Sequence, residues 1–110
     1  MSDLSTIRFT KPWLAVGPEH IEPLGAELQR ELSSEHVLFG QRVTAVARRQ
    51  DCDDVLFRLE HSPERYAVVH LTWTGRRETS SKWPETEMFD SLDQFVERMR
   101  QDSVEFEPSA

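Results

Sequence analysis

Two short connections constrain this chain more than any other feature of its sequence. They span residues 50–53 and 61–65, and they join three runs rich in β-branched and aromatic side chains at 42–49, 54–60 and 66–73. A parallel crossover needs about a dozen residues or more, so connections of this length join antiparallel neighbours. The sequence therefore predicts a three-stranded antiparallel meander.

A helix is predicted on each side of this meander along the chain. Leucines recur every four residues from 24 to 32, directly after Pro23, whose missing N–H costs nothing at the first helical position. This pattern predicts a helix from Pro23 to the segment 33–36. A second helix is predicted to begin after Ser91, where Gln94 completes a capping box, and to end at residue 102. The expected fold is α+β in the order α-β-β-β-α, formed by the whole chain as a single domain.

The alternation of side chains along a strand assigns each residue to one face of the sheet. Odd-numbered positions between 43 and 73 collect most of the large apolar side chains, so this face is predicted to be the core, with both helices packed on it. The even-numbered positions combine an apolar middle with a polar rim. The middle consists of Val46, Leu56 and Val68, and the rim consists of Arg48, Arg58, Tyr66 and His70.

The even-numbered face needs a cover, because contiguous exposed apolar surface is uncommon on monomers and marks an interface. One candidate is the N-terminal segment 1–17, which is predicted to be an extended arm carrying Phe9, Trp13 and Leu14. The other candidates are a second copy of the chain and a partner protein. The sequence leaves these alternatives open.

His70 is the polar residue of this face that is best suited to binding or catalysis. By parity it lies near Arg48, Arg58 and Tyr66, either as a half-buried histidine bonded to a neighbouring strand or as the centre of a binding surface. Trp83 follows in a polar segment, where a tryptophan either plugs the edge of the core or anchors a partner. These five residues are the predicted binding site.

Residues 74–88 are predicted to form a polar loop between the last strand and the second helix. Arg76, Arg77 and Lys82 make it locally basic, and three positive charges among Ser and Thr side chains could hold a phosphate. The segment lacks the glycine-rich cradle of a phosphate-binding loop, so solvated side chains are the expected arrangement.

No metal site, catalytic residue or cofactor is predicted. Asp51, Asp53 and Asp54 surround Cys52 and could bind a hard cation, but the segment lacks the glycine and the distal glutamate of a calcium loop. Aspartate is also a preferred turn residue. The four histidines show no HxH or HExxH spacing, and the acidic neighbours of Cys52 weaken its thiol as a nucleophile.

Charge and composition argue against several classes of function. Twenty acidic and 13 basic residues give a net charge of −7, which disfavours nucleic acid as a partner. No apolar run exceeds four residues, so no membrane-spanning segment is predicted, and a lone cysteine favours a reducing cytoplasm. Residues 83–110 hold eight acids and two bases, typical of a solvated surface or of a negative face for a basic partner. Residues 103–110 are predicted to be a frayed acidic tail.

Three sequence patterns carry a resemblance that covers roughly residues 40–105. DDVLF at 53–57, YAVVHLTWTG at 66–75 and WPET at 83–86 are similar to those of a group of small bacterial proteins. That resemblance implies a bacterial, cytoplasmic protein and assigns no functional residue. The predicted order of elements also resembles the double-stranded RNA-binding domain, but here the last helix begins with acidic residues, so that function is not implied.

The sequence predicts a non-enzymatic protein-interaction module of the inhibitor or immunity type. The reasons are the mixed sheet face, the acidic C-terminal segment and a sequence without a catalytic constellation. The alternative is a small ligand-binding protein or enzyme that uses His70, Arg48, Arg58 and Tyr66 over an apolar floor.

Overall fold

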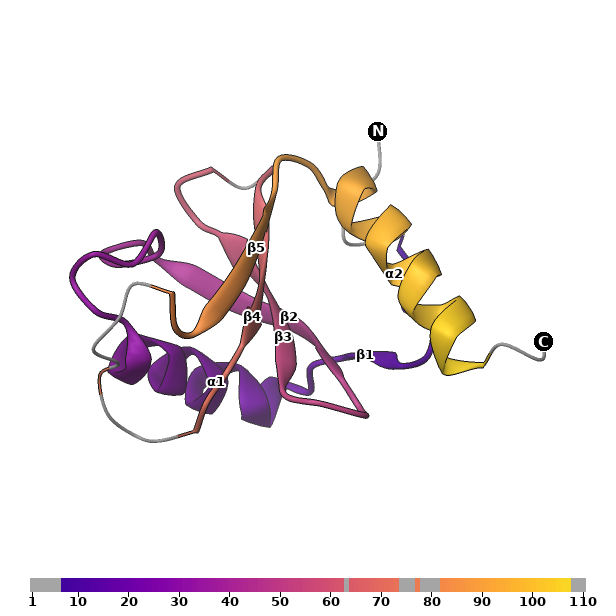
Figure 1. Ribbon diagram of the computed structural model, residues 1–110, viewed down its shortest axis with the longest axis horizontal. Coiled ribbons are helices and arrows are strands. Elements are labelled where there is room, and N and C mark those ends of the chain that lie inside the picture. Colours follow the sequence, from indigo (N-terminus) through magenta and orange to yellow (C-terminus); the bar gives the residue numbers. More distant parts are fainter. Residues whose placement is uncertain (1–6, 63, 74–76, 78–81, 108–110) are drawn as a thin grey trace.

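The computed structural model describes residues 7–62, 64–73, 77 and 82–107. They form an antiparallel sheet of five strands with two helices (Figure 1). The elements in chain order are β1 (Trp13–Ala15), α1 (Pro18–Glu31), β2 (Val43–Arg49), β3 (Asp54–Leu59), β4 (Tyr66–His70), β5 (Glu85–Phe89) and α2 (Leu92–Phe106). Strand order in the sheet follows chain order, which confirms the predicted α+β class and the antiparallel meander. Neither described helix is long and apolar enough to cross a membrane.

The sheet has two more strands than the sequence predicts, one at each edge. β1 lies within the predicted arm and pairs with β2, with Trp13 opposite Arg49. β5 lies within the predicted polar loop and pairs with β4, with Phe89 opposite Tyr66. Both are edge strands, where short length and charged side chains are common because these features discourage pairing with other chains. Such strands give a weak sequence signal.

The two helices lie on opposite faces of the sheet, so the prediction that both pack on one face is wrong (Figure 1). α1 packs through Leu24 and Leu28 against the odd-numbered face of β3 and β4. α2 packs through Phe95 and Met99 against the even-numbered face, which includes Leu56. The apolar middle of that face is therefore a second core rather than an exposed surface. Part of the N-terminal segment also covers this core, through the buried Trp13 and the partly buried Ile7 and Phe9.

A β-bulge in β2 changes the faces that parity predicts for this strand. The register with β3 shifts between Ala45 and Ala47, so that Val46 has no cross-strand partner there. Beyond the bulge, Ala47 belongs to the core under α2, whereas parity predicts it on the other face. Arg48 lies opposite Val55, a residue of the α1 core, and so moves to the α1 face.

The helix ends differ from the prediction in three places, and one of them is the end of α1, which lies at Glu31 and not within the segment 33–36. α1 begins at Pro18, directly after its N-cap Gly17, and Pro23 lies inside the helix. Proline is favoured at the first helical position because its missing N–H would have no partner there, and Pro18, not Pro23, is the proline that takes this position. At the C-terminus, α2 continues to Phe106, so residues 103–106 are helical and not frayed. Residues 108–110 lie outside the described part.

The start of α2 confirms the predicted cap. The Gln94 N–H donates to Oγ of Ser91 (3.3 Å), and Oε1 of Gln94 accepts from the Asp90 N–H (2.8 Å). These two bonds satisfy amides that would otherwise lack partners at the first turn. They fix the point at which the chain turns from β5 into α2.

Candidate functional site

A polar pocket lies where α2 leaves one end of the sheet face uncovered. Asp54, His70 and Glu85 form a row across β3, β4 and β5 at that end, because each is the cross-strand partner of the next. The pocket has a volume of about 450 Å³. Its lining consists of Asp54, Val68, His70, Glu85, Thr86, Glu87 and Arg98.

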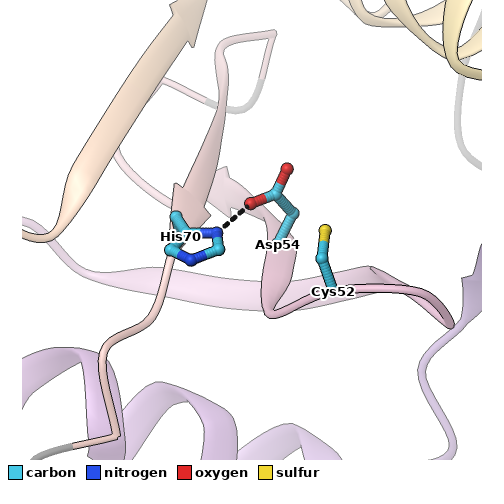
Figure 2. A group of neighbouring side chains, drawn as sticks. All are labelled: Cys52, Asp54 and His70. Carbon is cyan, nitrogen blue, oxygen red and sulfur yellow. Dashed lines mark hydrogen bonds and ion pairs between the residues drawn. The ribbon is translucent and has the colours of Figure 1, made fainter.

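His70 and Asp54 are held together across two paired strands (Figure 2). Nδ1 of His70 lies 2.7 Å from Oδ1 of Asp54, and the His70 side chain is 44% exposed. A carboxylate that accepts from one ring nitrogen fixes the orientation and the tautomer of the imidazole. This pair can bind a proton, a metal ion or a polar ligand at the pocket wall.

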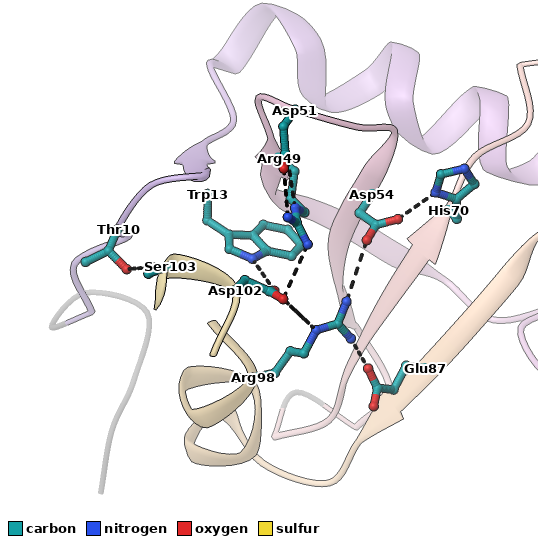
Figure 3. A network of polar contacts seen from close by, with 10 residues as sticks. All are labelled: Thr10, Trp13, Arg49, Asp51, Asp54, His70, Glu87, Arg98, Asp102 and Ser103. Carbon is teal, nitrogen blue, oxygen red and sulfur yellow. Dashed lines mark hydrogen bonds and ion pairs between the residues drawn. The ribbon is translucent and has the colours of Figure 1, made fainter. Parts of the chain in front are cut away.

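Arg98 connects this pair to α2 (Figure 3). Its guanidinium lies 3.7 Å from Oδ2 of Asp54, forms an ion pair with Glu87, and donates through Nε to Asp102 (3.2 Å). One cation therefore contacts three carboxylates from β3, β5 and α2. The arrangement keeps Asp54 in place and leaves the pocket with a surplus of negative charge.

Asp102 is a buried carboxylate whose oxygens are satisfied by three donors. The indole N–H of Trp13 donates to Oδ2 (2.9 Å), and Arg49 lies 3.3 Å from Oδ1, in addition to the bond from Arg98. Arg49 also donates to Asp51, and this bond raises the pKa of the guanidinium and lowers the pKa of the Asp51 carboxyl. These contacts fasten α2 to β1 and β2, so we regard them as structural.

Cys52 lies in the turn between β2 and β3, beside the His70–Asp54 pair (Figure 2). One ligand atom from each of Cys52, Asp54 and His70 lies within 4.8 Å of the other two. Burial raises the pKa of the Cys52 thiol, and the charges of Asp54 and Asp51 raise it further. A thiol with a raised pKa is a poor nucleophile near neutral pH, which is the result expected from its acidic neighbours.

Sequence spacing does not reveal this cluster, because its members come from a turn and two strands. Asp54 and His70 are 16 residues apart and match no local motif. The register of the β3–β4 hairpin brings them together. In the sequence, only the length of the connection between the two strands constrains that register. Asp51 and Asp53, which flank Cys52 in the sequence, are not part of the cluster.

The other predicted binding residues are not brought together around His70. Tyr66 is buried beneath α2, at the opposite end of β4 from His70. Arg58 is the cross-strand partner of Tyr66, and Arg48 lies on the α1 face. Of the predicted set, His70 alone lines the polar pocket, and Trp83 belongs to a different surface.

A second feature is a group of exposed hydrophobic side chains on the segments beside the C-terminal end of α1, which we call the aromatic end. It consists of Val37, Phe39, Trp73 and Trp83, four of the six large hydrophobic side chains that are exposed in the described part of the chain. Val37 and Trp83 line one pocket of about 570 Å³. Trp83 is 44% exposed, so it does not plug the core.

Trp73 corrects another prediction from parity. The sequence places it in the core as the last residue of a strand, but β4 ends at His70 and Trp73 is 47% exposed. Its backbone has a positive φ of 58°, which turns the chain away from the sheet. Arg77, further along, lies over the ring of Phe39 at 5.9 Å, while its predicted basic partner Arg76 lies outside the described residues.

Two buried polar side chains hold the aromatic end in place. The Glu31 carboxylate at the end of α1 accepts the N–H groups of Thr72 (2.9 Å) and Trp73 (2.8 Å). His36 accepts from the Leu38 N–H at Nδ1 (3.0 Å), so its Nε2 carries the proton and donates to the Pro84 carbonyl (2.9 Å). These bonds connect the segments that carry the exposed hydrophobic side chains.

Comparison of the chain with protein-family models, with curated proteins and with solved structures gives no match. The resemblance to small bacterial proteins therefore stays a prediction, and the arguments for function rest on the two features described above.

Proposed function

We propose that this protein is a non-enzymatic interaction module that binds a partner protein through the aromatic end. The observation that carries the proposal is the exposure of four large hydrophobic side chains on segments that the Glu31 and His36 bonds hold beside the end of α1, namely Val37, Phe39, Trp73 and Trp83. Trp is among the residues most enriched at the energetic centres of interfaces, and Trp83 lines a pocket together with Val37. Inhibitor-type binding requires only such a surface on a stable fold.

The surroundings of Trp83 support this function. The pocket beside it is bordered by the charged residues Glu35, Lys82 and Glu85. A hydrophobic centre within a polar rim is the usual composition of a protein interface. The buried bonds of Glu31 and His36 hold the adjacent backbone, which lowers the conformational entropy that is lost on binding.

The even-numbered sheet face, which the sequence predicts as the binding surface, is not available to a partner at its apolar middle. Phe95 and Met99 of α2 already occupy the apolar middle of that face. The acidic C-terminal segment also has internal partners, since at least four of its eight carboxylates form ion pairs with arginines. These pairs favour a solvated, internally balanced surface over a dedicated site for a basic partner.

The test is affinity capture from the proposed bacterial host with the full chain and two variants. Trp83→Ala removes the centre of the aromatic end, while Val104→Ala removes an exposed apolar side chain from α2. A protein captured by wild type should bind Trp83→Ala about 30-fold more weakly or worse, because truncating a central Trp costs about 2 kcal/mol or more. Val104→Ala should retain it within about threefold.

Two results would contradict the proposal. Equal retention by Trp83→Ala and wild type would show that the aromatic end is not the binding surface. Sedimentation of wild type as a dimer that becomes a monomer on Trp83→Ala would show that the surface binds a second copy of the chain instead.

A second candidate function is the binding of a small polar ligand in the pocket that His70 lines. The favouring observation is the oriented His70–Asp54 pair beside a pocket of about 450 Å³. A thermal-shift screen of small molecules is the test, repeated with His70→Ala. This candidate fails if the variant responds to every compound as the wild type does.

A further inference from the structure

We propose that Cys52, Asp54 and His70 form a zinc site with one coordination position open to the polar pocket. The three side chains converge from the β2–β3 turn, the start of β3 and the end of β4 (Figure 2). This inference concerns the pocket of the second candidate function and does not involve the aromatic end.

The donor set selects the class of metal ion. A thiolate, an imidazole nitrogen and a carboxylate oxygen are all common ligands of Zn²⁺, while the thiolate disfavours Ca²⁺ and Mg²⁺, which take oxygen ligands. Three protein ligands with a free fourth position are the pattern of zinc sites that bind a water or a substrate. The pocket in front of His70 gives that fourth position access to small molecules.

The distances fit after small side-chain movements. Zinc bonds of about 2.0–2.3 Å place tetrahedral ligand atoms roughly 3.4–3.6 Å apart. Here all three ligand atoms lie within 4.8 Å of one another. The distance between Nδ1 of His70 and Oδ1 of Asp54, now 2.7 Å, would increase when the metal ion replaces the hydrogen-bonded proton between them. Asp54 and His70 lie on paired strands, and the Leu71 N–H donates to the Asp53 carbonyl (3.2 Å), which holds the turn against β4.

The nearby charges are compatible with a cation. Arg98 lies 3.7 Å from Oδ2 of Asp54, which leaves Oδ1 for the metal and lets the guanidinium orient the carboxylate from outside. The charge of Arg98 is already shared with Glu87 and Asp102. Glu85, the cross-strand partner of His70, adds a further carboxylate at the pocket wall.

The experiment is a metal titration of the full chain, stripped with a chelator and kept under a thiol-free reductant. We expect one Zn²⁺ per chain by calorimetry, and a thiolate-to-cobalt charge-transfer band when Co²⁺ is used as the probe. Cys52→Ala, Asp54→Asn and His70→Ala should each weaken Zn²⁺ binding by about 100-fold or more. His61→Ala, at the turn between β3 and β4, is the matched control and should bind as wild type.

Cys52→Ala is the decisive variant, because Cys52 takes no part in the Arg98 network and circular dichroism can verify that the variant folds. Failure of wild type to bind Zn²⁺ up to about 100 µM overturns the proposal. Binding that survives Cys52→Ala, or a Co²⁺ spectrum without the thiolate band, also overturns it. Cys52 does not line the pocket, so ligand binding that survives Cys52→Ala would leave the second candidate function intact without its metal.

Discussion

Glu31 is a carboxylate without solvent exposure that accepts two backbone amides beyond the end of β4. Burial is the main cause that raises its pKa above the ordinary value of 4.5, and the hydrogen bond with Glu27 raises it further. The amides of Thr72 and Trp73 oppose this change in part. The side chain therefore has two consequences, one for the shape of the aromatic end and one for the dependence of stability on pH.

The pH dependence has a defined sign. A carboxyl group with a higher pKa in the folded chain stabilises the fold while it is protonated, and this contribution disappears as the pH rises through the folded pKa. The free energy of unfolding of wild type, minus that of Glu31→Gln, should therefore decrease between about pH 4 and pH 7. Urea unfolding at a series of pH values measures this difference.

Glu107→Gln, at the exposed C-cap of α2, is the control for loss of one negative charge. If the difference in the free energy of unfolding between wild type and Glu31→Gln stayed constant or increased with pH, burial would not raise the pKa of Glu31.

Periodicity in the sequence predicts the central strands of this sheet and fails at its two edges. β2, β3 and β4 are predictable, because short connections and strong β-propensity leave one simple arrangement. β1 has three residues, and β5 alternates Glu85 and Glu87 with less polar residues, so both edge strands give a loop-like signal. Long, apolar elements are predictable from local pattern, while edge strands depend on a neighbour that is already in place.

The candidate site is predictable only in part, for a related reason. His70 is predictable as a polar residue of the even-numbered face, but its partner Asp54 depends on the register of the β3–β4 hairpin, which no local residue type indicates. The bulge at Val46 is equally absent from any local pattern. Because of that bulge, parity assigns Arg48 to the wrong face. The placement of α2 decides that Tyr66 is buried, and helix placement is a property of the assembled core.

The packing of α2 against the sheet predicts how much stability its central side chain contributes. Phe95 is fully buried, and its ring meets Trp13 and Phe89 edge-on at centroid distances of 5.1 and 5.9 Å. Phe95→Ala should lower the free energy of unfolding by about 3–5 kcal/mol, because it leaves a cavity among aromatic rings. Urea unfolding followed by tryptophan fluorescence measures the loss.

Val104→Ala, on the same helix and 66% exposed, should change the free energy of unfolding by less than about 0.5 kcal/mol. If Phe95→Ala lost less than about 1 kcal/mol, α2 would contribute little to the second core.

The whole chain carries a net charge of −7, which predicts that it does not bind nucleic acid. Binding of nucleic acid depends on release of counterions by clustered basic residues, and a negative chain is repelled by phosphates. We expect no change in the fluorescence anisotropy of labelled duplex DNA or RNA at protein concentrations of about 10 µM in low salt. Binding that weakens as salt increases would contradict this expectation.

The contact between Thr10 and Ser103, whose hydroxyl oxygens lie 2.7 Å apart, brings the first and last described segments of the chain together beside α2 (Figure 3). The aromatic end lies at the other side of the sheet, next to the loop that follows α1 (Figure 1). A tether attached near Thr10 or near Ser103 would therefore hold the molecule from the same side on a solid support. Both attachments would present Trp83 and its neighbours to the solution, which makes tethered protein a suitable bait for the partner.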